Sequence, residues 1–440
     1  MKPVTEPRLS FLRSATVVAV GMAVMNVAAY GFTLLGTHRL VPEQFGAITA
    51  LLGLLLIGNV ASLGLQATGA RRLATSADDG SLADAMLRAG RRTAVGLTVV
   101  CLLATPLLMW LLHIDSVVAV VLLAPTLAGL TLMGSQLGVL QGSQRWGELA
   151  VVYTSVGLGR LVLGGGALLV HPSLDAAMIG LALGAAVPAV LGSVFLRGAG
   201  GSSSAQVKDV LRETAHGTHT LLAFFAIANA DVLLARGLFD GQHSGYYAAG
   251  VIVAKACLFL PQFVIVIVFP SLAGSPGDTA KLRRAVLAVA GLGVCTVLGT
   301  LLLPGLVVAV IGGADKYAPL GPFTWLFAIA GSAYAVLQMV VYAAIAQQEK
   351  RAALLIWAGL VLLALTATLT HPAGLTGVKT LVALTSACAL LLSAVLAAGL
   401  HRQSATPQAS PEPLVLLPEA GFGEAAGDGV GEDEQRKADD

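Results

Sequence analysis

Twelve stretches of mostly apolar residues, each about 20 residues or longer, follow one another along the 440-residue chain. A helix needs about 20 residues to cross the hydrocarbon core of a bilayer, and it satisfies its own backbone hydrogen bonds there. Only 11% of the residues are charged, against roughly 25% in soluble domains. The chain is therefore predicted to be an all-α, polytopic membrane protein. The expected spans are 14–36, 46–68, 94–113, 117–140, 149–171, 174–196, 218–240, 246–271, 285–311, 322–346, 352–370 and 375–400.

The positions of the basic residues predict which way the helices run. Lys and Arg are enriched in the cytoplasmic loops of membrane proteins. If the N-terminus is cytoplasmic, 20 of the 26 Lys and Arg residues fall in cytoplasmic segments, and only Arg39, Arg236, Lys316 and Lys379 fall on the external side. An odd number of spans would disrupt this alternation. We therefore expect both termini in the cytoplasm and interpret the first span as an uncleaved signal anchor.

A glycine- and serine-rich segment, 197–217, divides the expected spans six and six. This composition is typical of a flexible linker. We expect an N-terminal lobe over 1–196, a cytoplasmic linker over 197–217, and a C-terminal lobe over 218–401. Residues 402–440 are rich in Pro, Gly and acidic residues, which predicts a disordered, acidic cytoplasmic tail because such a composition buries no core.

A repeat with a period near 200 residues relates the two expected lobes. The segment 39–46 before the second span resembles the segment 236–246 before the eighth. Gln141 and Arg145 after the fourth span have counterparts in Gln347 and Arg351 after the tenth. Because an even number of spans separates the copies, the two halves are predicted to be parallel repeats, an arrangement common in transporters.

Five ionisable residues within the spans or at their ends are the candidates for a binding site. Asp231, Lys255 and Arg160 lie within spans, and Arg39 and Arg236 lie at the outer ends of the first and seventh. Charged groups inside a membrane are costly and usually face a cavity or a partner. Several cations with one carboxylate suit an aqueous cavity for an anionic headgroup such as a diphosphate.

These five residues also have alternative interpretations. Arg160 lies near the middle of its span, far from either interface, so we expect it to face a cavity, as we expect for Lys255. Asp231 is the only deep carboxylate; it is expected to neutralise Lys255, to pair with Arg236, or to sense a driving ion. Arg39 and Arg236 have a competing role, in which their side chains extend to the outer interface.

Other sequence features indicate packing rather than chemistry. Gly134, Gly138 and Gly142 recur every four residues, which predicts a helix face that a neighbouring helix approaches closely. The four cysteines lie inside spans without the spacing of metal ligands, so neither a disulfide nor a metal site is expected. Motifs of the GxSxG, HExxH and Walker A types do not occur. We expect no enzymatic activity, no cofactor and no nucleic-acid partner.

Several segments together resemble the polysaccharide-biosynthesis flippases of the multidrug/oligosaccharidyl-lipid/polysaccharide exporter superfamily. These segments are 39–46, 141–146, 159–161, 229–231, 245–247 and 269–270. The resemblance implies two six-helix lobes that move undecaprenyl-diphosphate-linked oligosaccharides across a bacterial cytoplasmic membrane. It implies a cationic central cavity, with Arg39, Arg160, Arg236 and Lys255 as the cations. It further implies membrane lipid and lipid-linked saccharide as ligands, and glycosyltransferases or a polymerase of the same pathway as partners.

Two other functions compete with this interpretation. An exporter of small cationic or amphiphilic compounds on the same fold would need a cavity dominated by acidic and aromatic residues, and Asp231 is the only deep acid. A membrane scaffold for cell-envelope assembly that transports nothing would tolerate neutral residues at Arg160 and Lys255.

Overall fold

The computed structural model describes residues 6–75, 79–197, 204–259, 279–347, 349, 351–370 and 372–404, which are almost entirely helical and contain no strand. Eleven helical segments within these ranges are long and apolar enough to cross a membrane. The remaining expected span, 246–271, begins in a helix and continues into residues 260–278, which lie outside the described part. The all-α, polytopic class is therefore confirmed.

The first half of the chain forms the helices that we call the N lobe. They are α1 (Glu6–Arg39), α2 (Pro42–Gly58), α3 (Val60–Thr75), α4 (Asp79–Leu112), α5 (Val117–Val121), α6 (Leu123–Gly142), α7 (Trp146–Gly159), the π-helix η1 (Arg160–Gly165), α8 (Gly166–Val170) and α9 (Leu174–Phe195). The second half forms the C lobe. Its helices are α10 (Ser204–Leu238), α11 (Gly241–Phe259), α13 (Thr279–Leu302), α14 (Pro304–Ile311), α15 (Ala314–Tyr317), the 3-10 helix η2 (Ala318–Phe323), α16 (Thr324–Ala346), α17 (Ala352–Thr370) and α18 (Gly374–Ser404).

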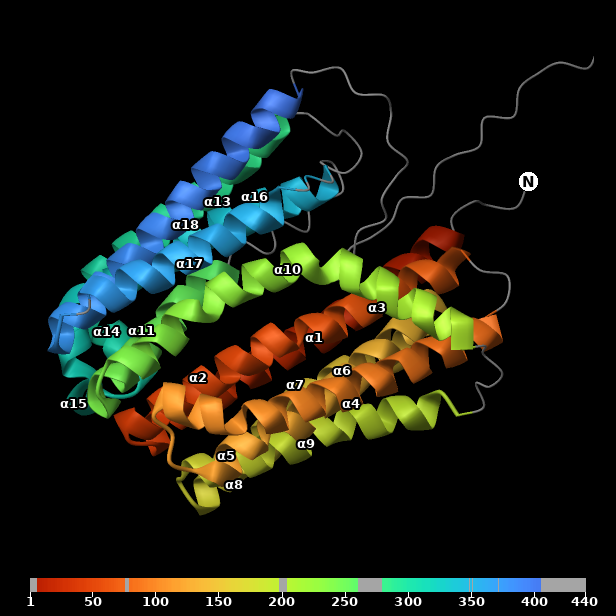
Figure 1. Cartoon of the computed structure of the whole chain (residues 1–440), viewed down its shortest axis with the longest axis horizontal. Helices are drawn as coiled ribbons and strands as arrows, with labels where there is room; N and C mark the ends of the chain where they lie inside the picture. The colour runs from red at the N-terminus through yellow and green to blue at the C-terminus, as the bar shows by residue number, and fades with distance from the viewer. Residues whose placement is uncertain are drawn as a thin grey trace, which may run out of the picture.

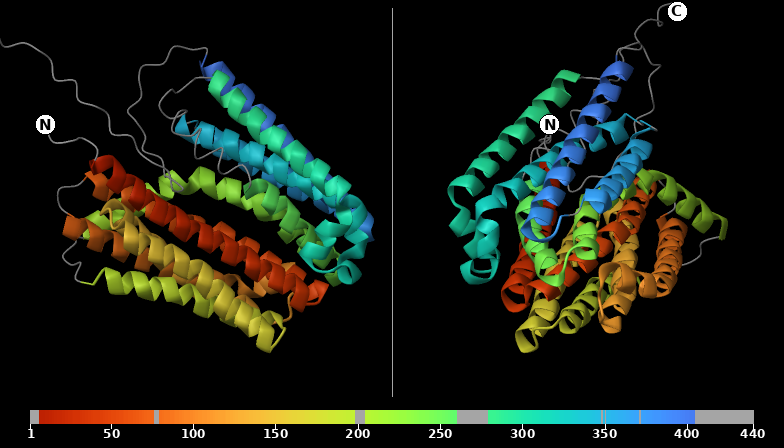
Figure 2. Two further views of the ribbon diagram at one scale, coloured as in Figure 1. Left: turned by 180° about the vertical axis from the view of Figure 1, so that it is seen from behind. Right: turned by 60° about the vertical axis from the view of Figure 1, so that its left-hand side comes forward.

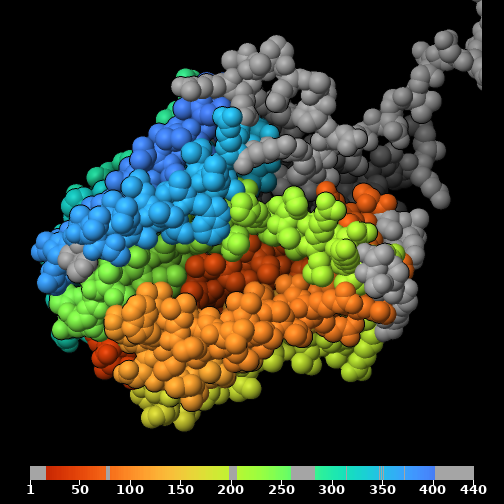
Figure 3. Space-filling model, in the orientation of Figure 1, coloured from red at the N-terminus to blue at the C-terminus, as the bar shows by residue number. Residues whose placement is uncertain are grey.

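The two lobes meet at one end of the bundle and diverge toward the other (Figures 1 and 2). We call the meeting end the Arg39 end, because α1 finishes there. From it α17 and α18 run away from α1, so that the lobes form a V. The helix α10 lies between them: it packs on α17 of its own lobe and on α2, α3 and α4 of the N lobe. The space-filling view shows a hollow between α10 and α4 with N-terminal residues at its floor (Figure 3).

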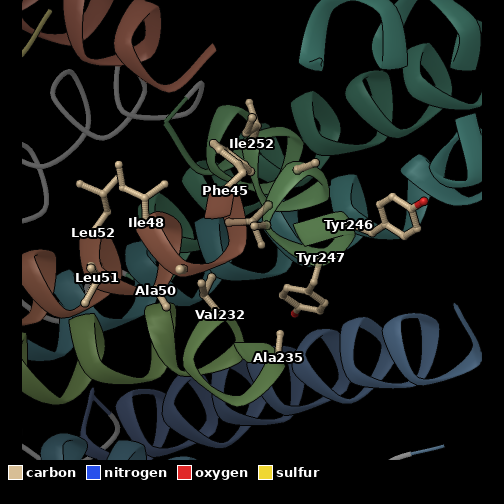
Figure 4. Packing of buried hydrophobic residues seen from close by; sticks show 14 of the residues in the cluster. Phe45, Ile48, Ala50, Leu51, Leu52, Val232, Ala235, Tyr246, Tyr247 and Ile252 are labelled. Atoms are coloured by element: carbon tan, nitrogen blue, oxygen red, sulfur yellow. The ribbon is translucent and has the colours of Figure 1, made fainter. Parts of the chain in front are cut away.

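A shared apolar core holds the lobes together near the Arg39 end. Phe45 and Leu51 of α2 belong to the same buried cluster as Val232 of α10 and Tyr247 of α11. Figure 4 shows these side chains gathered where the three helices cross. Tyr247 is among the largest fully buried side chains of the described residues. The contact between lobes at this end is therefore an ordinary hydrophobic core, stabilised by apolar burial.

Helix boundaries confirm the parallel repeat. Helix α1 ends at Arg39 and α10 ends at Leu238, 199 residues later; α2 begins at Pro42 and α11 at Gly241, again 199 residues later. The two copies also touch each other. A Cβ added to Gly245 would lie 2.1 Å from the carbonyl oxygen of Pro42, so only glycine allows this approach of α11 to α2.

The expected linker over 197–217 is partly wrong, because α10 already begins at Ser204. Residues 198–203, which carry most of the glycine and serine, lie outside the described part. Between Ala205 and Leu238 the sequence contains no proline, and Glu213 forms ion pairs with Arg71 and Arg72 of α3. Contact with the N lobe therefore supports helix in a segment whose polarity suggested a loop. The predicted tail, 402–440, begins inside α18, which ends at Ser404, and residues 405–440 lie outside the described part.

The glycine face predicted in the fourth span packs closely, as expected. Cβ atoms added to Gly134, Gly138 and Gly142 would lie 2.2 to 2.8 Å from atoms of α3. At Gly138 the nearest atom is the backbone oxygen of Gln66, which no side-chain rotation can relieve. These glycines therefore set the distance between α3 and α6.

Replacing Gly138 by Leu should lower the free energy of unfolding by about 1–3 kcal/mol, because the new side chain forces the two helices apart. Gly96→Leu is the matched control, since Gly96 lies in the exposed part of α4 with no atom within 4 Å of an added Cβ. The measurement is the thermal unfolding midpoint of the detergent-purified variants. Equal midpoints for the two variants would contradict the packing role of Gly138.

Candidate functional site

Arg160 opens the only π-helical segment of the described residues, at the end of α7. Its guanidinium carbon lies 5.0 Å from the centre of the Phe32 ring, which belongs to α1 and is itself buried. Within the described part, the Nε atom of Arg160 is buried and has no hydrogen-bond partner. π-helical turns inside α-helices occur frequently at functional sites. The fold thus holds a cation at membrane depth with an unused donor.

Lys255 brings a second cation to the same region from the opposite lobe. It lies on α11, and its Nζ donates a hydrogen bond of 3.1 Å to Oδ1 of Asn229 on α10. Its ammonium group lies within electrostatic range of both Asp231 and Arg160. Because Arg160 belongs to the N lobe and Lys255 to the C lobe, the two predicted cations approach the same region from opposite lobes.

Asp231 is almost fully buried, with 6% of its surface exposed, on the α10 side of this site. One carboxylate oxygen accepts a hydrogen bond of 2.9 Å from the Tyr247 hydroxyl, and the other accepts one of 2.9 Å from the Val232 amide. Its carboxylate also lies within electrostatic range of Lys255. No sequence pattern predicts that Tyr247 binds Asp231, since a tyrosine in a span usually indicates packing.

Arg236 lies at the Arg39 end of the bundle and is 5% exposed. Its Nε donates to the carbonyl of Leu112 at 2.9 Å, and Nη2 donates to the carbonyl of His113 at 2.8 Å. Nη1 donates to Oγ of Ser244 at 3.1 Å. The last carbonyls of a helix lack partners within the helix, so Arg236 caps α4. Its donors serve structure, and it holds α10 and α11 against the N lobe.

Arg39 is exposed at the last position of α1, at the same end as Arg236. That position fits the alternative in which its side chain reaches the membrane interface. Of the four predicted cations, the structure therefore brings Arg160 and Lys255 together and leaves Arg39 and Arg236 at the Arg39 end.

Lys316, which no sequence pattern marked as functional, also contacts the end of a helix. Its Nζ donates to the carbonyls of Leu40 at 2.8 Å, Thr37 at 3.0 Å and His38 at 3.3 Å. These carbonyls lie at the end of α1, so a cation of the C lobe caps a helix of the N lobe. The sequence pattern did not predict this contact. Its only indication was that Lys316 is one of the few basic residues expected on the external side.

Comparison with solved structures identifies the fold. The chain superposes on a multidrug resistance MATE family transporter of the MOP superfamily in an inward-facing conformation, with a TM-score of 0.70, 13% identity, and coverage of 87% of this chain and 94% of the other. It superposes on the lipid II flippase MurJ in an inward closed conformation with a TM-score of 0.68, 10% identity, and coverage of 89% and 90%.

A third similar structure is a MOP superfamily transporter from Pyrococcus furiosus, described as having a reversed polarity of its binding pocket that suggests a different function. Its TM-score is 0.54 at 12% identity, with coverage of 89% of this chain and 95% of the other. No family model and no curated protein matches the sequence. At these identities the likeness shows the fold alone: this is a multi-pass membrane protein with the fold of MOP superfamily transporters and flippases.

Replacing Arg236 by Met should lower the free energy of unfolding by about 1.5–3 kcal/mol, because buried carbonyls at the end of α4 lose a charged donor. Arg39→Met removes the same charge at the same end from an exposed side chain, so it serves as the matched control. Thermal unfolding of the purified variants measures the difference. A loss in Arg39→Met as large as that in Arg236→Met would argue against the capping role.

Proposed function

We propose that this protein moves a polyprenyl-diphosphate-linked oligosaccharide across the bacterial cytoplasmic membrane by alternating access, for polysaccharide biosynthesis. The observation that carries the proposal is a buried Arg160 Nε without a hydrogen-bond partner among the described residues, on a side chain within electrostatic range of Lys255 from the other lobe. The similar structures include a flippase of a lipid-linked substrate, MurJ. Membrane lipid and lipid-linked saccharide are then the ligands, and glycosyltransferases or a polymerase of the same pathway are the partners.

The charges at this site favour an anion. Arg160 and Lys255 supply two positive charges, and Asp231 is already engaged by the Tyr247 hydroxyl and the Val232 amide. The cost of holding two cations at membrane depth is offset when a diphosphate accepts their hydrogen bonds. Because one cation comes from each lobe, a bound diphosphate also draws the lobes together. Binding and lobe movement are thereby coupled.

The orientation follows from the distribution of basic residues. We propose that the Arg39 end faces outward and that both termini are cytoplasmic. The V of the lobes then opens toward the cytoplasm, where a lipid-linked precursor is made (Figure 1). In this arrangement Arg160 and Lys255 receive the diphosphate from the inner leaflet.

The main rival is a multidrug exporter, since the similar structures include MATE transporters. Such a protein takes cationic or amphiphilic compounds, which the pair Arg160 and Lys255 would repel. The Pyrococcus furiosus neighbour, described as having a pocket of reversed polarity, supports the use of pocket charge to separate functions on this fold. The net charge of the site therefore favours the anionic substrate over the drug.

Arg160→Gln and Lys255→Gln should each reduce flipping of a polyprenyl-diphosphate oligosaccharide by about 10- to 100-fold, which corresponds to the loss of one charge-assisted contact of roughly 1.5–3 kcal/mol. The measurement is the rate of flipping in proteoliposomes, normalised to the amount of protein inserted. Lys379→Gln is the matched control, since Lys379 is an exposed cation over the Phe323 ring on the C lobe.

Full flipping activity of both variants would exclude a cationic cavity formed by Arg160 and Lys255 and would place substrate binding at another site. Absence of flipping by the native protein would favour a non-transporting scaffold. Transport of a cationic dye in place of the diphosphate lipid, with a rate raised by Lys255→Gln, would favour the multidrug exporter.

Asp231 is proposed as the site that couples transport to a proton or sodium ion, because its carboxylate is buried in the described C lobe beside Lys255. In proteoliposomes with an imposed ion gradient, Asp231→Asn should abolish the acceleration by the gradient, since the neutral amide binds neither ion as a carboxylate does. Asp315→Asn, at an exposed position, should respond as the native protein does. A gradient response that persists in Asp231→Asn would remove Asp231 from the coupling mechanism.

A further inference from the structure

Two hydrogen bonds between the lobes are related by the repeat. Arg236 donates to the carbonyl of Leu112, the last residue of α4, and Thr37 donates through Oγ1 to the carbonyl of Ile311, the last residue of α14. Arg236 lies 199 residues after Thr37, and Ile311 lies 199 residues after Leu112. Each lobe therefore closes on the other at the Arg39 end through equivalent positions, one on each side of the bundle.

On the α10 side this contact is one part of a continuous attachment. Besides Leu112, the buried Arg236 guanidinium reaches the carbonyl of His113. Farther along the helix, Oγ1 of Thr214 donates to Oγ1 of Thr68 at 3.2 Å, and Glu213 pairs with two arginines of α3. Helix α10 is thus bonded to the N lobe near both of its ends. Separation on this side would expose many buried groups at once.

On the α1 side the attachment is confined to the last turn of the helix and α14, where polar contacts lie beside the buried Leu40 and Ile311. The Thr37 hydroxyl binds Ile311, and Lys316 caps the carbonyls of Thr37, His38 and Leu40. Lys316 is only partly buried, so water can replace its hydrogen bonds when it leaves. Helix α1 packs along its length on α7 and η1 of its own lobe. This side can therefore separate at a lower cost than the α10 side.

The local structure around Lys316 holds it in place. Gly313 adopts φ +95°, a left-handed conformation that favours glycine, and the chain turns there from α14 into α15. The next residue after Lys316, Tyr317, is fully buried, and its ring packs edge-on against Tyr246 at 6.0 Å between centroids. Lys316 is therefore presented to the end of α1 by a rigid turn, and its ammonium group is the part that can move.

We infer that Lys316 and Thr37 form the gate of the Arg39 end, and that the α10 side with Arg236 is a hinge that stays closed. When this end opens, the lobes part between α1 and α14. Loss of the Lys316 contacts therefore shifts the protein toward the state open at the Arg39 end. The inference rests on the alternating access of the proposed function, but it concerns lobe movement and is measured without any substrate.

The test uses a cysteine one helical turn below the gate. In a chain whose four native cysteines are changed to Ala, Thr33→Cys places a thiol on the face of α1 that carries Thr37. The purified chain is reconstituted in vesicles, and a membrane-impermeant maleimide is added at the face where a separate Asp315→Cys variant reacts. The rate of labelling at position 33 reports opening of the Arg39 end.

Lys316→Met should raise this labelling rate about 3- to 30-fold over the Lys316 chain. Lys379→Met is the matched control, because it removes an exposed cation of the C lobe for which the structure shows contact with the Phe323 ring rather than with α1, and its rate should not change. A rate in Lys316→Met equal to that of the control would overturn the gate assignment. This readout is independent of flipping activity, so a wrong substrate assignment leaves it intact.

Disulfide locks test the two sides separately, in chains that retain Lys316. A Cβ on Gly312 lies 3.2 Å from Cβ of Thr37, so a disulfide between Thr37→Cys and Gly312→Cys can cross the gate once the Tyr317 ring, which the new Cβ meets, shifts aside. A Cβ on Gly241 lies 2.6 Å from Cγ of Glu43, so Glu43→Cys with Gly241→Cys crosses the α10 side, where Arg236 binds Ser244.

Oxidation of the gate pair should abolish labelling at position 33, and reduction should restore it. Oxidation of the pair on the α10 side should leave the labelling rate unchanged, because the hinge does not separate. Mass spectrometry verifies each disulfide. Abolition of labelling by the lock on the α10 side, or persistence of labelling with the gate lock, would contradict the assignment of gate and hinge.

Discussion

The hydrogen bonds from Arg236 to the carbonyls at the end of α4 connect the two lobes at the Arg39 end of the bundle. A helix that ends inside or near a bilayer leaves carbonyls without partners, and these groups are costly to bury unsatisfied. Arg236 supplies the donors from the other lobe. The positions of α2, α10 and α11, and of the apolar core among them, depend on this contact (Figure 4).

The repeat makes the contact nearly symmetric, and the difference between its halves is informative. Thr37 occupies the position equivalent to Arg236 and bonds the equivalent carbonyl, but a hydroxyl has one donor where a guanidinium has five. Lys316, from a different element, adds donors on that side, but to the carbonyls at the end of α1 rather than those of α14. On the α10 side the cap is the buried Arg236, which makes several hydrogen bonds. On the α1 side the cap is Lys316, which solvent can reach. Such asymmetry lets a two-lobed bundle open in one place.

The site between the lobes shows why charges at membrane depth were the most useful residues in the sequence. Arg160 and Lys255 are far apart in the chain. Each was expected to face a cavity, because a cation in the middle of a span has a high free energy when it faces lipid. The structure places the two side chains, one from each lobe, within electrostatic range of each other. Arg236 was expected at the same site, but its position at the end of α10 places it among helix carbonyls, which accept the hydrogen bonds of its guanidinium. The sequence predicted a functional charge at Arg236, but the carbonyls at the end of α4 are its partners in the structure.

The sequence alone determined that the chain is a helical membrane protein built from two parallel repeats, because hydrophobic length and the 199-residue spacing are properties of the chain itself. It also predicted the glycine face of α6 that packs on α3. It did not determine that Ser204 begins α10, that Tyr247 binds Asp231, or that Lys316 caps α1. Each of these features depends on groups that lie on different helices. A hydrogen-bond donor pairs with the acceptor nearest to it in space, and that position is set only when the helices pack together.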